Sequence, residues 1–115
     1  MKIIEKKISR QQMMLEADVV FDDCMVKAVV DIRKELIAID AELHADLEDH
    51  LLGHGSRQSD LWGINFYPEE EEMEDFLEFD SLINIRPSQN NRSRGVEDGA
   101  IREKIVEVCN KWIEL

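Results

Sequence analysis

Two stretches of alternating apolar and polar residues follow each other between Met25 and Asp46, with a short polar link between them. A period of two is the signature of a β-strand with one buried face. The link, Arg33-Lys34-Glu35, has the length of a hairpin turn. The apolar positions are Val26, Ala28, Val30 and Ile32, then Ile37, Ile39, Ala41, Leu43 and Ala45. The sequence therefore predicts an antiparallel hairpin of residues 25–32 and 36–46.

Three further strands are predicted, over residues 2–8, 61–67 and 77–86. The last of these ends at Pro87, because proline has no N–H group to donate to a sheet. In the strand of residues 61–67, Trp62, Ile64 and Phe66 share one face. The acidic run of residues 69–75 that follows is expected to be an exposed connection.

Three helices are predicted from their caps and apolar stripes. The first starts at Ser9, which stands three residues before Gln12 as in a capping box, and its stripe of Met13, Ala17, Val20 and Phe21 ends at Cys24. A short helix covers residues 46–52, with Leu47, Leu51 and Leu52 inward. The last helix follows Asp98, a favourable N-cap.

This order of elements, β-α-β-β-(α)-β-β-α, is typical of the α+β class. We expect an antiparallel β-sheet of four to five strands with two main helices packed on one face. A chain of 115 residues corresponds to a single domain, residues 1–115. It has no apolar run near the ~20 residues that cross a bilayer and no secretory signal, so a cytoplasmic location is expected. Cys24 and Cys109 fall on apolar stripes and are expected to be buried thiols.

The charge is strongly negative. The chain has 26 Asp and Glu against 14 Lys and Arg, a net charge of −12. Such a field repels nucleic acids and anionic membranes, so neither is an expected partner. A basic protein, a divalent cation or a second copy of the chain is more compatible. A homodimer is expected because apolar residues (Leu36, Ala38, Phe76 and Leu82) interrupt the polar face of the predicted sheet.

One segment departs from this acidity, and we call it the arginine loop (residues 80–98). From Ser81 to Gly95 it has three arginines and no acid. Arginine binds carboxylates and phosphates through two parallel donors, and amides and hydroxyls add neutral donors. The candidate contact residues for an anion or a partner are Arg86, Ser88, Gln89, Asn91, Arg92, Ser93 and Arg94. The alternative is that these arginines pair with the protein's own carboxylates.

A second candidate group lies on the polar face of the predicted strands 61–67 and 77–86. If these strands pair, Asn65, Glu78, Asp80 and Asn84 converge near Arg86. They would form either a catalytic pocket or a salt-bridge network on an open sheet face. Ser81 and Ser88 have no evident histidine partner, which weakens the enzyme interpretation.

A third candidate is a metal site at Glu42, His44 and Asp46. On a strand these alternate residues share a face, and an imidazole with two carboxylates can hold a divalent ion. The alternative is an ordinary polar outer face. The chain has no Walker or dinucleotide-binding fingerprint, and no cofactor is expected.

Two segments resemble a small prokaryotic family of uncharacterised proteins. They are DLWGINFYP (residues 60–68) and FDSLINIRPSQNNRSRGVED (residues 79–98), preceded by ELHAD. The resemblance implies a compact single domain in a bacterial or archaeal cytosol, and it brings no activity, cofactor or catalytic residue with it.

The sequence thus predicts a small acidic protein whose role is binding or assembly, as a homodimer that uses the arginine loop. The alternative is a small-molecule enzyme or ligand-binding protein in which the arginines hold an anionic group. Glu78, Asp80 or His44 would then act as the acid or base.

Overall fold

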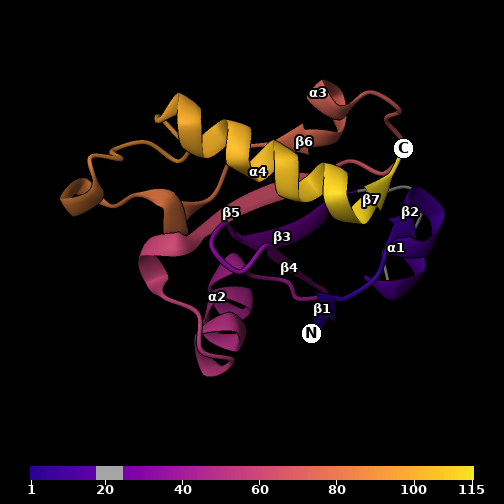
Figure 1. Cartoon of the computed structure of the whole chain (residues 1–115), viewed down its shortest axis with the longest axis horizontal. Coiled ribbons are helices and arrows are strands. Elements are labelled where there is room, and N and C mark those ends of the chain that lie inside the picture. Colours follow the sequence, from indigo (N-terminus) through magenta and orange to yellow (C-terminus); the bar gives the residue numbers. More distant parts are fainter. Residues whose placement is uncertain (18–24) are drawn as a thin grey trace.

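The computed structural model describes residues 1–17 and 25–115, and a five-stranded antiparallel sheet lies at its centre (Figure 1). The strand order is β1-β4-β3-β5-β6, and a smaller sheet pairs β2 with β7 in parallel. The strands are β1 (Lys2–Ile4), β2 (Ile8–Ser9), β3 (Val26–Asp31), β4 (Leu36–Ile39), β5 (Leu61–Phe66), β6 (Leu77–Glu78) and β7 (Ile113–Glu114). The helices are α1 (Arg10–Glu16), α2 (His44–Gly53), α3 (Met73–Phe76) and α4 (Gly99–Trp112).

The predicted hairpin is confirmed as β3 and β4, and the buried Asp31 organises its turn. One carboxylate oxygen accepts hydrogen bonds from the backbone N–H groups of Arg33 (2.9 Å) and Lys34 (2.8 Å). The other accepts a hydrogen bond from the hydroxyl of Ser56, 2.6 Å away. Glu35 completes the turn with a φ of 57°. A buried carboxylate is tolerated here because both of its oxygens are hydrogen-bonded.

The two faces of the sheet pack against different helices, which Figure 1 shows as α4 on one side and α2 on the other. One face packs on α1 and α4 through Met13, Ile105, Val108 and Cys109. The other face packs on α2 through Val29, Ala38, Leu47, Leu51 and Leu61. The α+β class, the five-stranded antiparallel sheet and the placement of two main helices on one face are therefore confirmed.

The predicted helix starts at Ser9 and Asp98 are also confirmed. The Ser9 hydroxyl accepts a hydrogen bond from the backbone N–H of Gln12 at 3.1 Å, and the Asp98 carboxylate accepts one from Ala100 at 2.8 Å. The predicted stripe residues Val20, Phe21 and Cys24 lie outside the described residues. Leu52, predicted to point inward, is instead 37% exposed. Within the described ranges no helix has the length and apolar character to cross a bilayer.

The predicted strand of residues 36–46 is wrong beyond Ile39. Asp40 takes a left-handed φ of 73°, which ends the extended conformation, and α2 begins at His44. The strand predicted over residues 2–8 is likewise divided into β1 and β2. In both places residue types that favour a strand continue past the point where the extended conformation ends.

The predicted strand of residues 77–86 is wrong beyond Glu78. Two short 3₁₀ turns, Leu82–Asn84 and Pro87–Gln89, replace it. The buried side chain of Asn84 takes the place of a strand, because its amide accepts a hydrogen bond from Gly63 N–H (2.8 Å) and donates one to Gly63 C=O (2.9 Å). Gly63 allows this close approach, since a Cβ there would lie 2.5 Å from the Cβ of Ser81.

The apolar patch on which the homodimer prediction rested does not form on one surface. Ala38 is buried beneath α2, and Phe76 is buried on the opposite side of the sheet, where its ring stacks on Phe66 at 4.9 Å. Leu82 is 66% exposed. The acidic run of residues 69–75 was expected to be an exposed connection, but it leads into the short helix α3. Phe76 is the last residue of α3 and is the residue that this helix buries.

Candidate functional site

Arg86 is buried, and the protein itself occupies its guanidinium group. Nε donates a hydrogen bond to the carbonyl of Ile83 (2.9 Å) and Nη1 donates one to the carbonyl of Gln58 (2.8 Å). Nη2 donates to the carbonyl of Leu61, and the group lies 4.9 Å from the ring centre of Trp62. Burial lowers the Arg86 pKa, although an arginine remains charged at physiological pH. Arg86 therefore has a structural role, because its donors hold backbone segments together, and its contact with an anion or a partner stays a prediction.

Asn91 is the second buried organiser of the arginine loop. Its amide nitrogen donates to the carbonyls of Asn84 (2.8 Å) and Gly95 (2.8 Å), and its oxygen accepts from the N–H of Glu97 (2.8 Å). Backbone hydrogen bonds in both directions join it to Arg86. Asn84 is likewise buried. These two asparagines thus maintain the loop conformation, and neither belongs to the lining of the pocket that Asp80 and Arg94 share.

The remaining loop candidates lie at the surface. Ser88, Arg92 and Ser93 are exposed, and the Arg92 guanidinium has no partner within the described part of the chain. The partly buried Gln89 donates a hydrogen bond to the carbonyl of Ser59 (3.2 Å). Arg94 donates from Nε to Asp80 Oδ1 (2.6 Å), with both side chains partly exposed. Arg86 and Arg94 therefore contact different neighbours, and the three arginines do not form one anion cradle.

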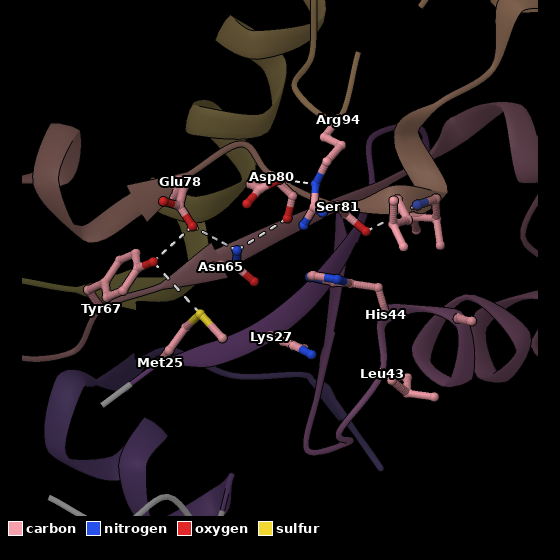
Figure 2. Close-up of a pocket in the computed structure, with 13 residues that line it drawn as sticks. Met25, Lys27, Leu43, His44, Asn65, Tyr67, Glu78, Asp80, Ser81 and Arg94 are labelled. Atoms are coloured by element: carbon pink, nitrogen blue, oxygen red, sulfur yellow. Dashed lines mark hydrogen bonds and ion pairs between the residues drawn. The ribbon is translucent and has the colours of Figure 1, made fainter. Parts of the chain in front are cut away.

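Arg94 and Asp80 belong instead to a pocket of about 580 Å³, which we call the α2 pocket (Figure 2). It lies on the α2 side of the sheet, where α2 covers one end of the face and leaves the other open. Its polar lining comprises Lys27, His44, Asn65, Tyr67, Glu78, Asp80, Ser81 and Arg94. Its apolar lining includes Met25, Leu43 and Leu82, all exposed by more than a third.

Strand register creates the floor of the α2 pocket. Lys27 on β3 pairs directly with Asn65 on β5, and Asn65 pairs directly with Glu78 on β6. Directly opposite residues in antiparallel strands have neighbouring side chains on the same face. Three polar side chains thus form a row across three strands. The predicted convergence of Asn65, Glu78 and Asp80 is observed, whereas Asn84 and Arg86 lie elsewhere.

Glu78 is the acceptor at one end of this row. Its Oε1 accepts hydrogen bonds from the amide nitrogen of Asn65 (2.8 Å) and from the hydroxyl of Tyr67 (2.8 Å). Burial raises the pKa of Tyr67, and its hydrogen bond to the Glu78 carboxylate raises it further. On the other side of Asn65, Lys27 Nζ donates to the carbonyl of Glu42 at 2.7 Å. Hydrogen bonds within the protein therefore hold all three side chains of the row.

His44 is the first residue of α2 and lies beside the row. Its Nε2 is 2.8 Å from the carbonyl of Ile64. A carbonyl only accepts hydrogen bonds, so Nε2 carries the proton, and Nδ1 of the neutral ring is an acceptor. Burial lowers the His44 pKa, partly offset by the hydrogen bond to Ile64. The neutral ring is therefore the form that folding favours.

The shared face predicted for Glu42, His44 and Asp46 is wrong. His44 opens a helix, whereas Glu42 precedes it in a non-strand segment and is exposed, as is Asp46. Residues 1–17 and 25–115 contain no group of three His, Cys, Asp or Glu side chains that could hold a metal ion. The physical reason is that β4 ends at Ile39. Residues 42, 44 and 46 therefore do not lie on a strand, where alternate side chains would share a face.

Sequence reasoning missed Lys27, Tyr67, Met25 and Leu43 as residues of the site. The signal that could have found Lys27 is register. Once β3 and β5 are both recognised, their antiparallel alignment pairs Lys27 with Asn65. Leu43 carried a misleading signal, because the alternation assigned it to a buried face although it is 56% exposed.

Comparison with known protein families gives a match over nearly the whole chain. A family model described as "Protein of unknown function (DUF5674)" matches residues 2–112. The chain belongs to this family. No curated protein and no solved structure matches the chain. Membership in DUF5674 confirms the predicted resemblance to an uncharacterised family, and the match spans the arginine loop and every residue of the α2 pocket.

The chemistry available in the α2 pocket is that of recognition by charge and hydrogen bonds. It combines two carboxylates, two cations, an amide and a phenol with an apolar rim. Pockets of this size that combine an apolar lining with a few converging polar groups are typical small-molecule sites.

Proposed function

We propose that this DUF5674 protein binds a small polar molecule in the α2 pocket. The observation that carries the proposal is the convergence, from β3, β5, β6 and α2, of side chains far apart in the sequence. Their hydrogen bonds fix them in place, so little conformational entropy remains to be lost on binding.

The uncovered part of the sheet supports the same proposal. On this face α2 covers the sheet over Val29 and Ala38. Over Lys27, beside the buried Asn65, the cover is missing, and exposed Leu43 and Leu82 lie at the edge of the opening. An apolar rim around an ordered polar floor favours an amphipathic ligand.

The arginine loop supports this site from behind. Asn84 fixes residues 81–84 against Gly63, and its amide nitrogen also donates to the carbonyl of Arg94 (2.9 Å). These contacts position Asp80 and Arg94 at the edge of the pocket. In this proposal most of the loop is structural, and Arg94 is its contribution to ligand contact.

Two-dimensional ¹H–¹⁵N NMR with a library of small cationic, anionic and neutral compounds tests the proposal. We expect some compounds to shift the backbone amides of Lys27, Asn65 and Ser81. The substitution Ala45→Phe, at the pocket wall, should abolish these shifts by filling the space. Ala100→Phe is the matched control, because Ala45 and Ala100 are each the second residue of their helix and exposed. If no compound shifts these amides, or if Ala45→Phe changes nothing, the proposal is wrong.

Assembly is the competing candidate, and the exposed rim residues Met25, Leu43 and Leu82 favour it. A second copy that covered this rim would bury apolar surface that is now exposed to water. Light scattering of the wild type and of Leu82→Ser separates the two. A dimer that the substitution dissociates supports assembly, whereas a monomer in both cases leaves ligand binding as the function of this surface.

A further inference from the structure

The structure points to a specific ligand class for the α2 pocket: we propose a primary ammonium group carried on an apolar chain. This inference rests on the proposed function and deepens it. It follows from the hydrogen-bonding capacity that the pocket leaves unused.

The decisive group is the side-chain oxygen of Asn65. Asn65 is only 4% exposed, and its Oδ1 has no hydrogen-bond partner within the described ranges. Its orientation is chemically fixed, since the amide nitrogen faces the Glu78 carboxylate (2.8 Å) and the Asp80 carbonyl (3.2 Å), which both only accept. The oxygen must therefore face the other way, and Figure 2 shows it directed between Met25, Lys27 and His44.

A buried acceptor without a donor carries a desolvation cost that a ligand donor can remove. The neutral His44 ring does not supply this donor, because its proton is used at the Ile64 carbonyl. A side-chain hydrogen bond with Asn65 raises the His44 pKa, so only the protonated ring would supply the donor. The oxygen has almost no exposed surface, so an incoming N–H group must displace part of the lining. Met25, which is 36% exposed at the pocket rim, is the side chain best placed to move.

Two carboxylate oxygens add to this unused accepting capacity. Glu78 uses Oε1 for both Asn65 and Tyr67, and Asp80 uses Oδ1 for Arg94. The second oxygen of each carboxylate has no hydrogen-bond partner in the part of the chain that the structure describes. An ammonium group has three N–H donors and a positive charge, which matches an amide oxygen beside carboxylates.

The cations of the pocket are already engaged with acceptors. Lys27 donates to the Glu42 carbonyl and Arg94 is paired with Asp80, so an anionic ligand must compete with both. The net charge of −12 also raises the local concentration of cations around the protein and lowers that of anions. The rim residues Leu43 and Leu82 then accommodate an apolar chain.

The N-terminus of α2 indicates a second group that the ammonium ligand can carry. It has no side-chain cap, and Figure 2 shows it across the pocket from Glu78 and Asp80. An uncapped N-terminus favours a negative group. A carboxylate on the same ligand would therefore lie near Lys27 and the start of α2, while the ammonium group faces Asn65.

NMR titrations with hexylamine, hexan-1-ol and hexanoate test the ammonium group, because these probes share one chain and differ in the head group. Hexylamine should bind about tenfold more tightly than the other two, as expected for charge-assisted hydrogen bonds. Norleucine distinguishes the ligand sources. If norleucine binds more tightly than hexylamine, and Lys27→Met abolishes this difference, the ligand class is an amino acid. If norleucine binds more weakly than hexylamine, the ligand class is a simple amine.

Protein variants localise the effect. Glu78→Gln keeps an acceptor for Asn65 and Tyr67 but removes the charge, and it should weaken hexylamine binding about tenfold. Glu74→Gln, exposed on α3, makes the same change in net charge away from the pocket and should have little effect. Asp80→Asn serves as a second variant if Glu78→Gln fails to fold.

The outcomes separate this inference from the proposed function. Equal weakening by Glu78→Gln and Glu74→Gln, or preferred binding of hexanoate or hexan-1-ol in the pocket, overturns the ammonium assignment and leaves ligand binding intact. If no compound of any class shifts the pocket amides, the proposed function itself fails. Selective, Glu78-dependent binding of hexylamine supports both.

Discussion

Arg86 and Arg94 lie eight positions apart in the same loop, and the structure gives them opposite roles. Arg86 is 8% exposed and its guanidinium connects backbone carbonyls from three segments. Arg94 is 55% exposed at its side chain and makes one ion pair at the edge of a pocket. The comparison teaches that burial and the kind of acceptor, rather than the presence of arginine, separate a structural cation from one available to a ligand.

The largest expected effect is at Arg86. Arg86→Met should destabilise the protein by about 3–5 kcal/mol, because it leaves buried carbonyls without donors and removes a buried ion-pair partner of Glu48. Urea unfolding followed by circular dichroism measures the change. Arg86→Lys should recover only part of it, since one ammonium group cannot reproduce a planar set of five donors. A loss below 1 kcal/mol would show that Arg86 is not the structural arginine of the pair.

Gly63 tests the surface on which residues 81–84, just before Arg86, pack. Gly63→Ala should cost about 1–3 kcal/mol, because the new Cβ would meet the Cβ of Ser81 at 2.5 Å. Adding Ser81→Gly should recover part of the loss by removing that contact. Urea unfolding of the single and double variants provides the test, and additive losses would contradict direct steric contact.

His44 offers a smaller, pH-dependent effect at the pocket end. Burial holds its folded-state pKa below the ordinary value of 6.5, so the unfolded chain binds the proton more readily. Stability should therefore fall as pH decreases through about 6.5 toward the lower folded-state pKa. In His44→Gln this component should disappear, which unfolding at pH 7.5, 6.5 and 5.5 would measure.

The same series contains its own control. Glu16 and Glu35 also have lowered pKa values, so their contribution to stability is lost on acidification. The wild type and His44→Gln both contain these two residues. Their contribution therefore cancels between the wild type and His44→Gln. Identical pH profiles for the two proteins would contradict the assigned role of His44 burial.

The smallest expected effect is at Arg94. Arg94→Ala should change stability by less than about 1 kcal/mol, because its ion pair with Asp80 is exposed and screened by solvent. Thermal unfolding at low and high salt checks this. A loss comparable to that of Arg86→Met would remove the distinction between the two arginines.

Much of the fold was predictable because local signals agreed with it. The β3–β4 hairpin, the caps at Ser9 and Asp98 and the central strand β5 all follow from period, turn length and cap chemistry. These features depend on neighbouring residues and need no knowledge of the tertiary structure. They were sufficient to predict an antiparallel α+β domain with α1 and α4 on one face.

The segment after Glu78 was not predictable by the same reasoning. Residues 77–86 alternate like a strand, but the hydrogen bonds that a strand would make are supplied by the side chain of Asn84. Nothing local in the sequence reveals that Asn84 lies opposite a glycine in β5. That pairing depends on contacts across 21 positions, which periodicity does not contain.

The candidate site was partly predictable for a related reason. Asn65, Glu78 and Asp80 were identified because pairing of two neighbouring strands was a simple hypothesis. Lys27 required the register of a third strand, and His44 required the end of β4 at Ile39 to be known. Because the end of β4 was predicted in the wrong place, His44 was assigned to a metal site and not to the α2 pocket.

The short β6 has one more consequence. It pairs only with Asn65 and Phe66, which leaves the rest of β5 without a neighbouring strand on that side. There Asn84 occupies both backbone groups of Gly63, and Arg86 occupies the carbonyl of Leu61. A free sheet edge is a template for pairing with another chain and for aggregation. These two side chains block that template, so the arginine loop also protects the molecule from edge-to-edge association.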